Sequence, residues 1–565
     1  MTNMDALLEG YENTKLLHYL DAAKREGELV PFDRLSEYEG DGVLKMNLRK
    51  PDGKLWQLYS EQGNHVGVIA ATRLGKTSSY VIPTVLSFAR QKRKKSMLIS
   101  DPKGEIYRHT AGELQRQGYD VKLINIRDAL HSEFWNPLTP IFREYRKVCE
   151  IADSVETVKT PKGLRNRFFG KIYEDQAELD RMIARRQRMA MGTVEKDVEA
   201  LSHMLIPVRT MKDPYWEKSA GLTLQGFLWA MLEDSREETR VDIGIPPITE
   251  NTFSFSTLFS VYDQMRCDHD FHDGGYFSKR RPDSRAYKLV KNVLLENATM
   301  TRHGVVTTFN TAMAAMREAS VRTVTICNSF EISSLIEKPT AVFIDYKDEE
   351  QAHYQVISLF VQDAYRRLIT MATERESGAL DVPFYFILDE FGNFPEIENF
   401  KTVISAAAGR AVYFILILQS YAQLEAVYGK DTAEIIRDNL NVQVMLGTNN
   451  PSTLEEFSKS CREYTRISPL SAVNGNADTM NTYQVETIRL LPRSRLAHFS
   501  PGECVVTEAN CPYVLWSRME RYYLCDEYKG AEMLSEMAYK AANDPFDDAF
   551  IYEANLENGN FFDDD

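Results

Sequence analysis

The sequence lacks the features that would place the protein outside the cell or across a membrane. Its seven cysteines form no C-x-x-C pair, and an odd, scattered set is typical of reduced thiols in the cytosol. No apolar run approaches the roughly 18 residues needed to cross a bilayer, and the first residues have neither the basic nor the apolar region of a signal peptide. We therefore expect a soluble, cytoplasmic protein.

An excess of basic residues is also absent. Lys and Arg total 67 against 82 Asp and Glu, which gives a net charge of −15. This balance argues against a protein that coats nucleic acid with its whole surface, although local basic patches remain possible. Hydrophobic residues make up 43% and charged residues 26% of the 565 residues. These values exclude a wholly disordered, collagen-like or coiled-coil chain, and the length suffices for several domains.

The C-terminal end has no basic residues at all. Residues 543–565 contain eight acidic side chains and no Lys or Arg, with several aromatic residues between them. Such a segment is usually a solvated end, and an electrostatic docking arm is the alternative. We treat residues 526–565 as a C-terminal acidic tail.

A phosphate-binding motif follows the first strong apolar run. Residues 65–83 pass from apolar residues through Gly75-Lys76-Thr77 into a helical pattern, which indicates strand, loop and helix. In such a loop the backbone N–H groups hold phosphates, a Lys bridges the β and γ phosphates, and a hydroxyl binds Mg²⁺. The full pattern has Gly where this chain has Ala70, and an incidental G-K-T turn is the alternative. The expected nucleotide-binding residues are Thr72, Arg73, Leu74, Gly75, Lys76, Thr77 and Ser78.

A pair of acids follows another apolar run, Phe384–Phe391 (FYFILDEF). A buried parallel strand that ends in two acids can supply the carboxylates that a nucleoside triphosphatase needs. We expect Asp389 to hold the metal together with Thr77, and Glu390 to polarise the attacking water. Gln419 follows the next apolar run, where it can sense the γ-phosphate. A helix-capping acid and a buried structural Gln are the alternatives.

Further apolar runs predict one parallel sheet with helices between its strands. They are residues 96–100, 121–126, 341–345, 412–418 and 442–446. This alternation predicts an α/β fold with a RecA-like P-loop ATPase core. Lys76 and Asp389 are too far apart for a minimal core, so we expect a large inserted, mostly helical domain. The expected segments are a leader (1–62), the first part of the core (63–143), the insert (144–335) and the second part of the core (336–525).

Two features of the insert suggest binding of nucleic acid or of a metal, although each has a simpler interpretation. Residues 162–188 mix basic and aromatic side chains, which suits nucleic acid, but a solvated helix face is more common. Cys267, His269 and His272 have metal-ligand residue types, but they form one short cluster without a second half. We assign no metal to them.

Taken together, the motifs resemble the type IV secretion coupling proteins, which are ATPases that connect a relaxase–DNA complex to the conjugation channel. The similarity extends in order over residues 63–523. It rests on 70–77 (AATRLGKT), 101–105 (DPKGE), 135–138 (WNPL), 213–216 (DPYW), 388–391 (LDEF), Gln419-Ser420 and the end segment 501–522.

The resemblance implies six subunits around a channel, with ATP and Mg²⁺ at the subunit boundaries. It implies relaxase, accessory relaxosome proteins and single- or double-stranded DNA as partners. Arg410, in a Gly-Arg pair before a strand, matches the family's arginine finger, which reaches the neighbouring nucleotide; Arg437 is the reserve candidate. Many members carry transmembrane helices and this sequence shows none, so either the anchor is absent by nature or the sequence is truncated. We favour the first alternative and expect a membrane anchor protein or channel ATPase to recruit the protein to the inner face of the membrane.

Two other functions share this core. One is a general DNA pump or a protein-secretion ATPase, and the other is a nucleotide-gated adaptor that tethers the relaxosome without hydrolysis. The presence of Lys76, Thr77, Asp389 and Glu390 argues against an adaptor, because a degenerate ATPase would usually have lost one of them.

Overall fold

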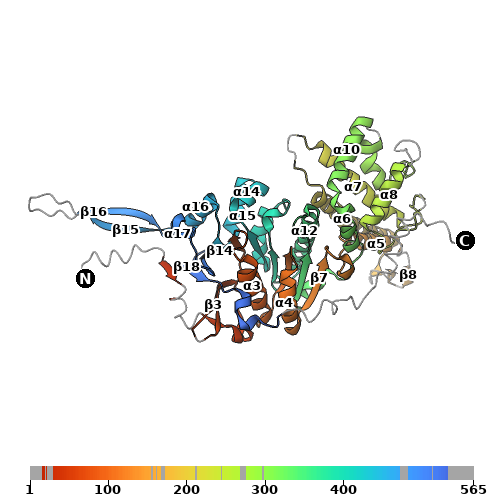
Figure 1. The fold of residues 1–565 in the computed structure, drawn as a ribbon. Helices are drawn as coiled ribbons and strands as arrows, with labels where there is room; N and C mark the ends of the chain where they lie inside the picture. Colours follow the sequence, from red (N-terminus) through yellow and green to blue (C-terminus); the bar gives the residue numbers. More distant parts are fainter. Residues whose placement is uncertain are drawn as a thin grey trace, which may run out of the picture. The chain divides into compact units, whose positions relative to one another are not determined.

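The computed structural model divides the chain into two compact units, each built from separated stretches of sequence (Figure 1). The sheet unit draws on residues 1–123, 332–348 and 364–538, and the helical unit on residues 124–331, 349–363 and 539–565. Helix α12 (Gln351–Thr373) is shared between these ranges. The structure describes residues 15–18, 21, 29–51, 53–153, 157–160, 162–166, 172–209, 213–242, 245–267, 275–295, 298–470, 482–511 and 513–531.

The sheet unit is built on one ten-stranded sheet in the order β1-β18-β17-β14-β5-β13-β12-β6-β11-β7. Its strands are β1 (Lys15–His18), β5 (Val66–Ala70), β6 (Ser96–Asp101), β7 (Asp120–Asn125), β11 (Thr340–Asp345), β12 (Phe384–Leu388), β13 (Val412–Leu418), β14 (Val442–Gly447), β17 (Glu503–Glu508) and β18 (Tyr513–Arg518). All the apolar runs that the sequence predicts as strands are therefore confirmed. The sheet is mixed rather than purely parallel, because β17 runs antiparallel to both β14 and β18.

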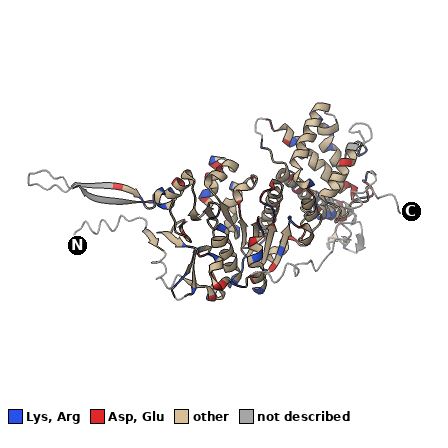
Figure 2. Ribbon diagram, in the orientation of Figure 1, with Lys and Arg blue, Asp and Glu red and all other residues tan. Residues whose placement is uncertain are grey.

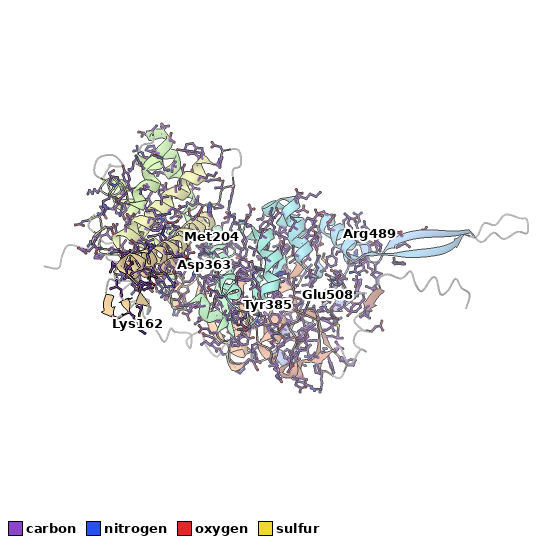
Figure 3. All side chains as sticks on the ribbon, turned by 180° about the vertical axis from the view of Figure 1, so that it is seen from behind. Lys162, Met204, Asp363, Tyr385, Arg489 and Glu508 are labelled. Atoms are coloured by element: carbon purple, nitrogen blue, oxygen red, sulfur yellow. The ribbon has the colours of Figure 1, made fainter. Side chains whose placement is uncertain are left out.

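The central strands are buried along their whole length, as strands covered on both faces must be. Every residue of β5 and of β12 is buried. Phe386 of β12 and Phe414 of β13 stack with ring centroids 4.9 Å apart. The buried Tyr385, labelled in Figure 3, packs on Tyr413 at the same centroid distance. The covering helices are α3 (Ile82–Arg90), α4 (Glu105–Arg116), α13 (Phe400–Ala407), α14 (Tyr421–Tyr428) and α15 (Lys430–Asn439).

The predicted leader also contains a small sheet. It consists of β2 (Val30–Pro31), β3 (Leu44–Arg49) and β4 (Leu55–Tyr59), in the order β2-β4-β3. Lys45 of β3 forms a largely buried ion pair of 2.7 Å with Glu508 of β17, and Glu508 is labelled in Figure 3. Residues 30–59 are thus part of the sheet unit.

A strand pair and two short helices lie between β14 and β17 in the sequence. The elements are α16 (Pro451–Ser460), β15 (Glu463–Leu470), β16 (Thr482–Arg489) and α17 (Arg493–Leu496). β15 and β16 form an antiparallel pair of their own, and Arg489 marks the end of β16 in Figure 3. The sequence analysis predicts none of these four elements.

The helical unit confirms the predicted helical insertion. Its helices are α5 (Thr139–Asp153), α6 (Gln176–Leu205), α7 (Tyr215–Asp234), α8 (Phe255–Cys267), α9 (Arg285–Val290), α10 (Thr299–Ala312) and α11 (Ala319–Val324). It also contains a three-stranded sheet of β8 (Thr157–Thr160), β9 (Gly163–Asn166) and β10 (Ile172–Tyr173). Helix α7 is buried on most of its sides, and its Phe227 contacts aromatic rings of three other segments.

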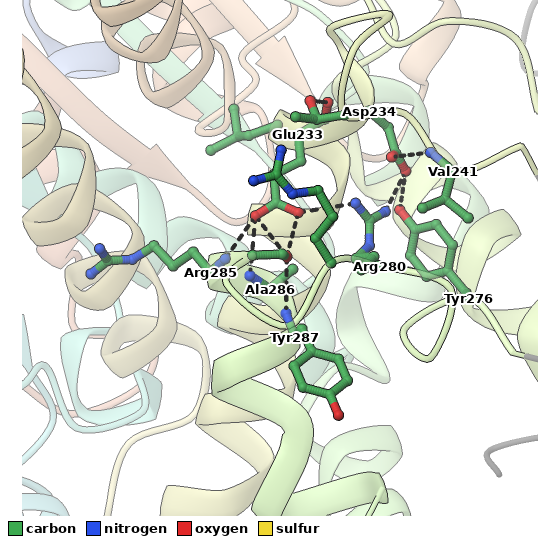
Figure 4. Close-up of polar contacts among 12 residues, drawn as sticks. Glu233, Asp234, Val241, Tyr276, Arg280, Arg285, Ala286 and Tyr287 are labelled. Atoms are coloured by element: carbon green, nitrogen blue, oxygen red, sulfur yellow. Dashed lines mark hydrogen bonds and ion pairs between the residues drawn. The ribbon is translucent and has the colours of Figure 1, made fainter.

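A buried charge network joins the end of α7 to the start of α9 (Figure 4). The guanidinium of Arg280, whose side chain is 1% exposed, lies 2.6 Å from Asp234 and 3.1 Å from Glu233. Tyr276 donates its hydroxyl to Asp234. Glu233 also accepts hydrogen bonds from Ser284 and from the first backbone N–H groups of α9. The network therefore gives both carboxylates several partners and fixes the segment between the two helices.

No helix in the described part of the chain combines the length and the apolar character that a membrane span requires. Basic and acidic residues are interspersed along the ribbon rather than separated by sign (Figure 2). His269, His272 and residues 532–565 of the predicted acidic tail lie outside the described residues.

Candidate nucleotide site

The predicted phosphate loop connects β5 to a helix, as the sequence indicates. Ala70 ends β5 as a fully buried residue, and the next N–H, that of Ala71, donates to Gly447 at 2.8 Å. The positive φ angles lie further along the loop, at Arg73 (67°) and Gly75 (89°). Ala70 therefore occupies a position that needs no glycine conformation, and the departure from the full motif does not strain the loop.

The helix after the loop begins with Lys76 and Thr77 of the motif. Residues 76–81 form a π-helical turn, η2, that continues into α3, and Ser79 donates its N–H to Gly75. The first N–H groups of a helix have no acceptor within it, and they create a positive end that suits an anion. Thr72, Arg73 and Leu74 are exposed, whereas Gly75, Lys76, Thr77 and Ser78 are half-buried.

Four of the predicted catalytic side chains meet at one place. Lys76 Nζ forms an ion pair with Glu390 Oε1 and lies 3.5 Å from Asp389 Oδ1. Thr77 Oγ1 donates to Asp389 Oδ2 at 3.2 Å. Gln419 Nε2 donates to Glu390 Oε2 at 3.0 Å. A lysine, a hydroxyl, two carboxylates and an amide from three separate segments thus form one continuous cluster.

The order of the strands explains this convergence. β5, β13 and β12 are neighbours and run parallel, so their carboxyl ends share one edge of the sheet. The phosphate loop follows β5, Gln419 follows β13, and Asp389-Glu390 follow β12. Ligands of parallel α/β sheets bind outside this edge.

Burial is the largest cause of the pKa shifts of two carboxylates at this edge, Asp389 and Asp101. Desolvation raises the pKa of Asp389 above its ordinary value, while the Lys76 ammonium acts in the opposite direction. Burial raises the pKa of Asp101, at the end of β6, to about 7, and the neighbouring charges of Asp345 and Asp389 contribute in the same direction. A divalent cation beside such a carboxylate would stabilise its charged form.

Asp101 is a residue of this edge to which the sequence analysis gives no role. It is 1% exposed, and one carboxylate oxygen accepts a hydrogen bond of 2.8 Å from the N–H of Tyr107. The sequence pattern could have predicted a place for Asp101 at this edge, since Asp101 comes at the end of an apolar run, as Asp389 does.

Arg410 does not join the cluster within one chain. It belongs to the 3-10 turn η8 (Ala408–Arg410), directly before β13, whereas Gln419 follows the end of β13. At about 3.3 Å per residue the strand separates the two residues by roughly 20 Å. Arg410 Nη1 donates to the carbonyl oxygen of Ala406 at 2.9 Å.

Arg437, the reserve candidate, has structural partners. Its guanidinium lies 3.6 Å from Glu456 and over the ring of Tyr421, with 5.0 Å to the centroid. The side chain is 13% exposed. These contacts favour Arg410 over Arg437 as an arginine that is available to a second molecule.

The basic stretch 162–188 is described only in part. Residues 176–188 lie on α6, where Arg181, Arg185, Arg186 and Arg188 are exposed. Residues 167–171 lie outside the described part. Nucleic-acid binding by this stretch stays a prediction.

Comparison with known proteins shows the family of the chain. The family model described as "Type IV secretory system Conjugative DNA transfer" matches residues 33–492, most of the chain. The chain belongs to this family. One relative, the conjugal transfer protein TraG of Escherichia coli, is 24% identical over 436 residues, which cover 74% of this chain and 58% of TraG. The chain thus spans less than two thirds of the length of this family member.

Solved structures of the family share the fold. The unbound monoclinic form of the bacterial conjugative coupling protein TrwBdeltaN70 matches with a TM-score of 0.56 and 16% identity, covering 87% of this chain and 91% of that one. The plasmid coupling protein TrwB in complex with ADP and Mg²⁺ matches with a TM-score of 0.50 and 14% identity, covering 81% and 85%. At these identities the matches establish the α/β fold with its helical insertion.

Proposed function

We propose that this protein is the coupling ATPase of a conjugative type IV secretion system. In this role it recruits the relaxase–DNA complex and uses ATP hydrolysis to drive or license its delivery to the transfer channel. The observation that carries the proposal is the single cluster of Lys76, Thr77, Asp389, Glu390 and Gln419 at the carboxyl edge of the sheet. Family membership supports the conjugative setting.

The cluster contains the groups that phosphoryl transfer requires. Lys76 now pairs with Glu390, and it would exchange this partner for the phosphates of ATP. Glu390, released from Lys76, would orient the attacking water, and Gln419 would hold the carboxylate of Glu390 in place through its amide. Gln419 is itself held, because its backbone N–H donates to Gln423 and its carbonyl oxygen accepts from Thr448.

The residues present also fit Mg²⁺, which TrwB binds together with ADP in a solved structure. Thr77 supplies a hydroxyl and Asp389 a carboxylate, and the two already share a hydrogen bond of 3.2 Å. These are the oxygen donors that a hard cation prefers. When bound, Mg²⁺ would neutralise charge on the phosphates.

The distance between Arg410 and its own cluster supports a role in trans. In a ring of subunits each interface is heterologous, so a residue far from the site of its own chain can reach the site of the next. We assign Arg410 as an arginine finger that stabilises the charge on the transferring phosphate of a neighbour. Self-association, as a hexamer by family resemblance, is therefore part of the proposal.

DNA, the relaxase and the accessory relaxosome proteins are the proposed partners. A membrane anchor protein or the secretion channel ATPase would bring the assembly to the inner face of the membrane. Contacts to DNA are expected mainly at phosphates, so binding should weaken steeply with salt and show little base preference.

Steady-state ATP hydrolysis at low salt tests the proposal. We expect turnover that rises with protein concentration and with single-stranded DNA, and that disappears in Lys76→Ala. If wild-type protein binds ATP but hydrolyses none under any of these conditions, the result would favour the nucleotide-gated adaptor. DNA-independent turnover would favour a protein-secretion ATPase.

A further inference from the structure

A turn near the C-terminus lies beside the phosphate loop, although about 440 residues of sequence separate them. The guanidinium Nε of Arg521 is 3.6 Å from the position that a Cβ on Gly75 would occupy. Arg521 precedes the 3-10 turn η9 (Tyr522–Leu524), which follows the end of β18. β18 runs antiparallel to β17, and β17 runs antiparallel to β14, so β18 has the same direction as β14. Because β14 is parallel to β5, β18 ends at the same edge of the sheet as β5.

The charge of Arg521 is not neutralised by an acid. Among the described residues no acidic side chain pairs with it, and its Nη1 donates a hydrogen bond to the hydroxyl of Tyr523 at 2.6 Å. Arg518, three residues earlier, shows the contrast, because it pairs with Glu520 at 2.6 Å. An arginine without an acid partner, beside a phosphate loop, has the charge and geometry to bind an anion.

The same turn exposes large apolar side chains. Tyr523 is 51% exposed and Leu524 59%, and Leu74 of the phosphate loop is 43% exposed. The turn is nevertheless anchored on both sides. Glu520 donates its N–H to the carbonyl oxygen of Asn47 at 2.9 Å. Cys525 and Tyr528 are buried after the turn.

Tyr522 adds a third anchor, because its ring lies 4.9 Å from that of His109 in α4. The fold therefore holds the exposed Tyr523 ring in a defined place, next to an uncompensated arginine. A fixed, exposed aromatic ring is a suitable surface for a flat ligand group.

We propose that the turn 521–524 forms the nucleoside side of the nucleotide site, with Arg521 binding a phosphate and Tyr523 packing against the base. This inference rests on the proposed function and extends it. The cluster of Lys76, Asp389, Glu390 and Gln419 marks the side of the loop where the phosphate is transferred. Arg521 approaches the loop at Gly75, whose Cβ position also lies 3.3 Å from the hydroxyl of Ser78. One nucleotide would thus be held by residues from both ends of the chain.

Calorimetric titration of the full chain with ADP and with inorganic pyrophosphate, both with Mg²⁺, tests the two contacts separately. Arg521→Ala should weaken the binding of both probes about tenfold, because each contains phosphate. Tyr523→Ala should weaken ADP binding by a similar factor and leave pyrophosphate binding unchanged. Tyr523→Phe keeps the ring and should bind ADP nearly as wild type does.

Controls separate the possible failures. Lys529→Ala removes an exposed cation of the same segment and should change neither affinity. Circular dichroism and thermal melting of each variant establish that it is folded, and Arg521→Lys, which keeps the charge, should restore part of the affinity. A folded Arg521→Ala that binds both probes like wild type would overturn the phosphate contact. Equal losses for ADP and pyrophosphate in Tyr523→Ala would overturn the base contact.

The outcome for Lys76→Ala distinguishes this inference from the proposed function. If Lys76→Ala loses ADP binding while Arg521→Ala and Tyr523→Ala do not, the nucleotide site stands and the turn 521–524 has no part in it. If Lys76→Ala binds ADP normally, or if wild-type protein binds none, the nucleotide site itself is misassigned and both proposals fail.

Discussion

The two units of the chain use buried charge in different ways. In the sheet unit, Lys76, Asp389 and Glu390 meet at the open edge of parallel strands, where a ligand can replace one partner of each pair. In the helical unit, Arg280 lies between Glu233 and Asp234, and the two acids also accept hydrogen bonds from Tyr276, Ser284 and backbone N–H groups.

The difference shows how the same residue types serve chemistry in one place and stability in another. A cluster that keeps its charges accessible to a ligand can exchange a lysine partner for a phosphate. A buried network in which both carboxylates already have several partners instead fixes two helices. Variants of the first should lose activity, and variants of the second should lose stability.

The largest expected effect is the loss of turnover in the sheet unit. Lys76→Ala should lower the rate of ATP hydrolysis by more than about 100-fold, because a preorganised charge at the transferring phosphate is removed. Steady-state hydrolysis at saturating protein concentration measures this. Retention of a tenth or more of the wild-type rate would remove Lys76 from the catalytic cluster.

Glu390→Gln should separate binding from hydrolysis. The amide is nearly the same size as the carboxylate but cannot polarise water, so turnover should fall by a similar factor while nucleotide affinity stays close to wild type. Calorimetric titration with ATP and Mg²⁺, beside the hydrolysis assay, measures both quantities. A variant that binds poorly and yet hydrolyses what it binds would show that Glu390 positions the nucleotide instead.

Arg280→Ala should destabilise the helical unit by about 3–5 kcal/mol, since it leaves two buried acids without their cation. Arg281→Ala is the matched control, because its side chain is 72% exposed and pairs with the exposed Asp283. That control should cost about 0–1 kcal/mol. Denaturant unfolding monitored by circular dichroism measures the difference between the two variants, and equal costs would contradict the account of this network.

A smaller, pH-dependent effect is expected at His65, in the sheet unit. Burial lowers the pKa of this imidazole from 6.5 to about 4 in the folded protein. The unfolded chain therefore binds a proton that the folded chain does not, and stability should be lost as pH falls from about 6.5 to 4, by about 3 kcal/mol. His65→Gln keeps an acceptor for the N–H of Phe414 and has no imidazole to protonate. Its free energy of unfolding should therefore fall less than that of the wild type between pH 6.5 and pH 4. Parallel curves of unfolding free energy against pH for wild type and His65→Gln would contradict this role of His65.

The sequence predicts the central strands well because each is a short, uninterrupted apolar run. Residues 384–388 and 412–418 are buried on both faces, and no other element type suits runs of that length. Asp389 and Gln419 could be predicted as site residues because each directly follows such a run, and Glu390 because it is the next residue after Asp389. The small sheet of β2, β3 and β4 is less visible, since polar residues such as Lys45, Asn47 and Gln57 are buried within it.

Other features depend on tertiary contacts that no local pattern encodes. The position of Arg521 beside Gly75 follows from β18 joining the sheet through β17 and β14, an arrangement set by long-range pairing. The pairing of Arg280 with Glu233 and Asp234 likewise joins residues far apart in the sequence. Spacing along the chain carries no signal for either.

The central claim is that hydrolysis occurs at a site shared by two copies of the chain, with the phosphate loop of one and Arg410 of the next. Mixing Lys76→Ala with Arg410→Ala tests it most directly, because each variant supplies the part that the other lacks. We predict that neither variant hydrolyses ATP alone and that an equal mixture recovers about one quarter of the wild-type rate, the share of interfaces with both intact parts in a randomly mixed ring. A mixture no more active than the sum of its components, or an Arg410→Ala variant with normal turnover, would contradict the shared site.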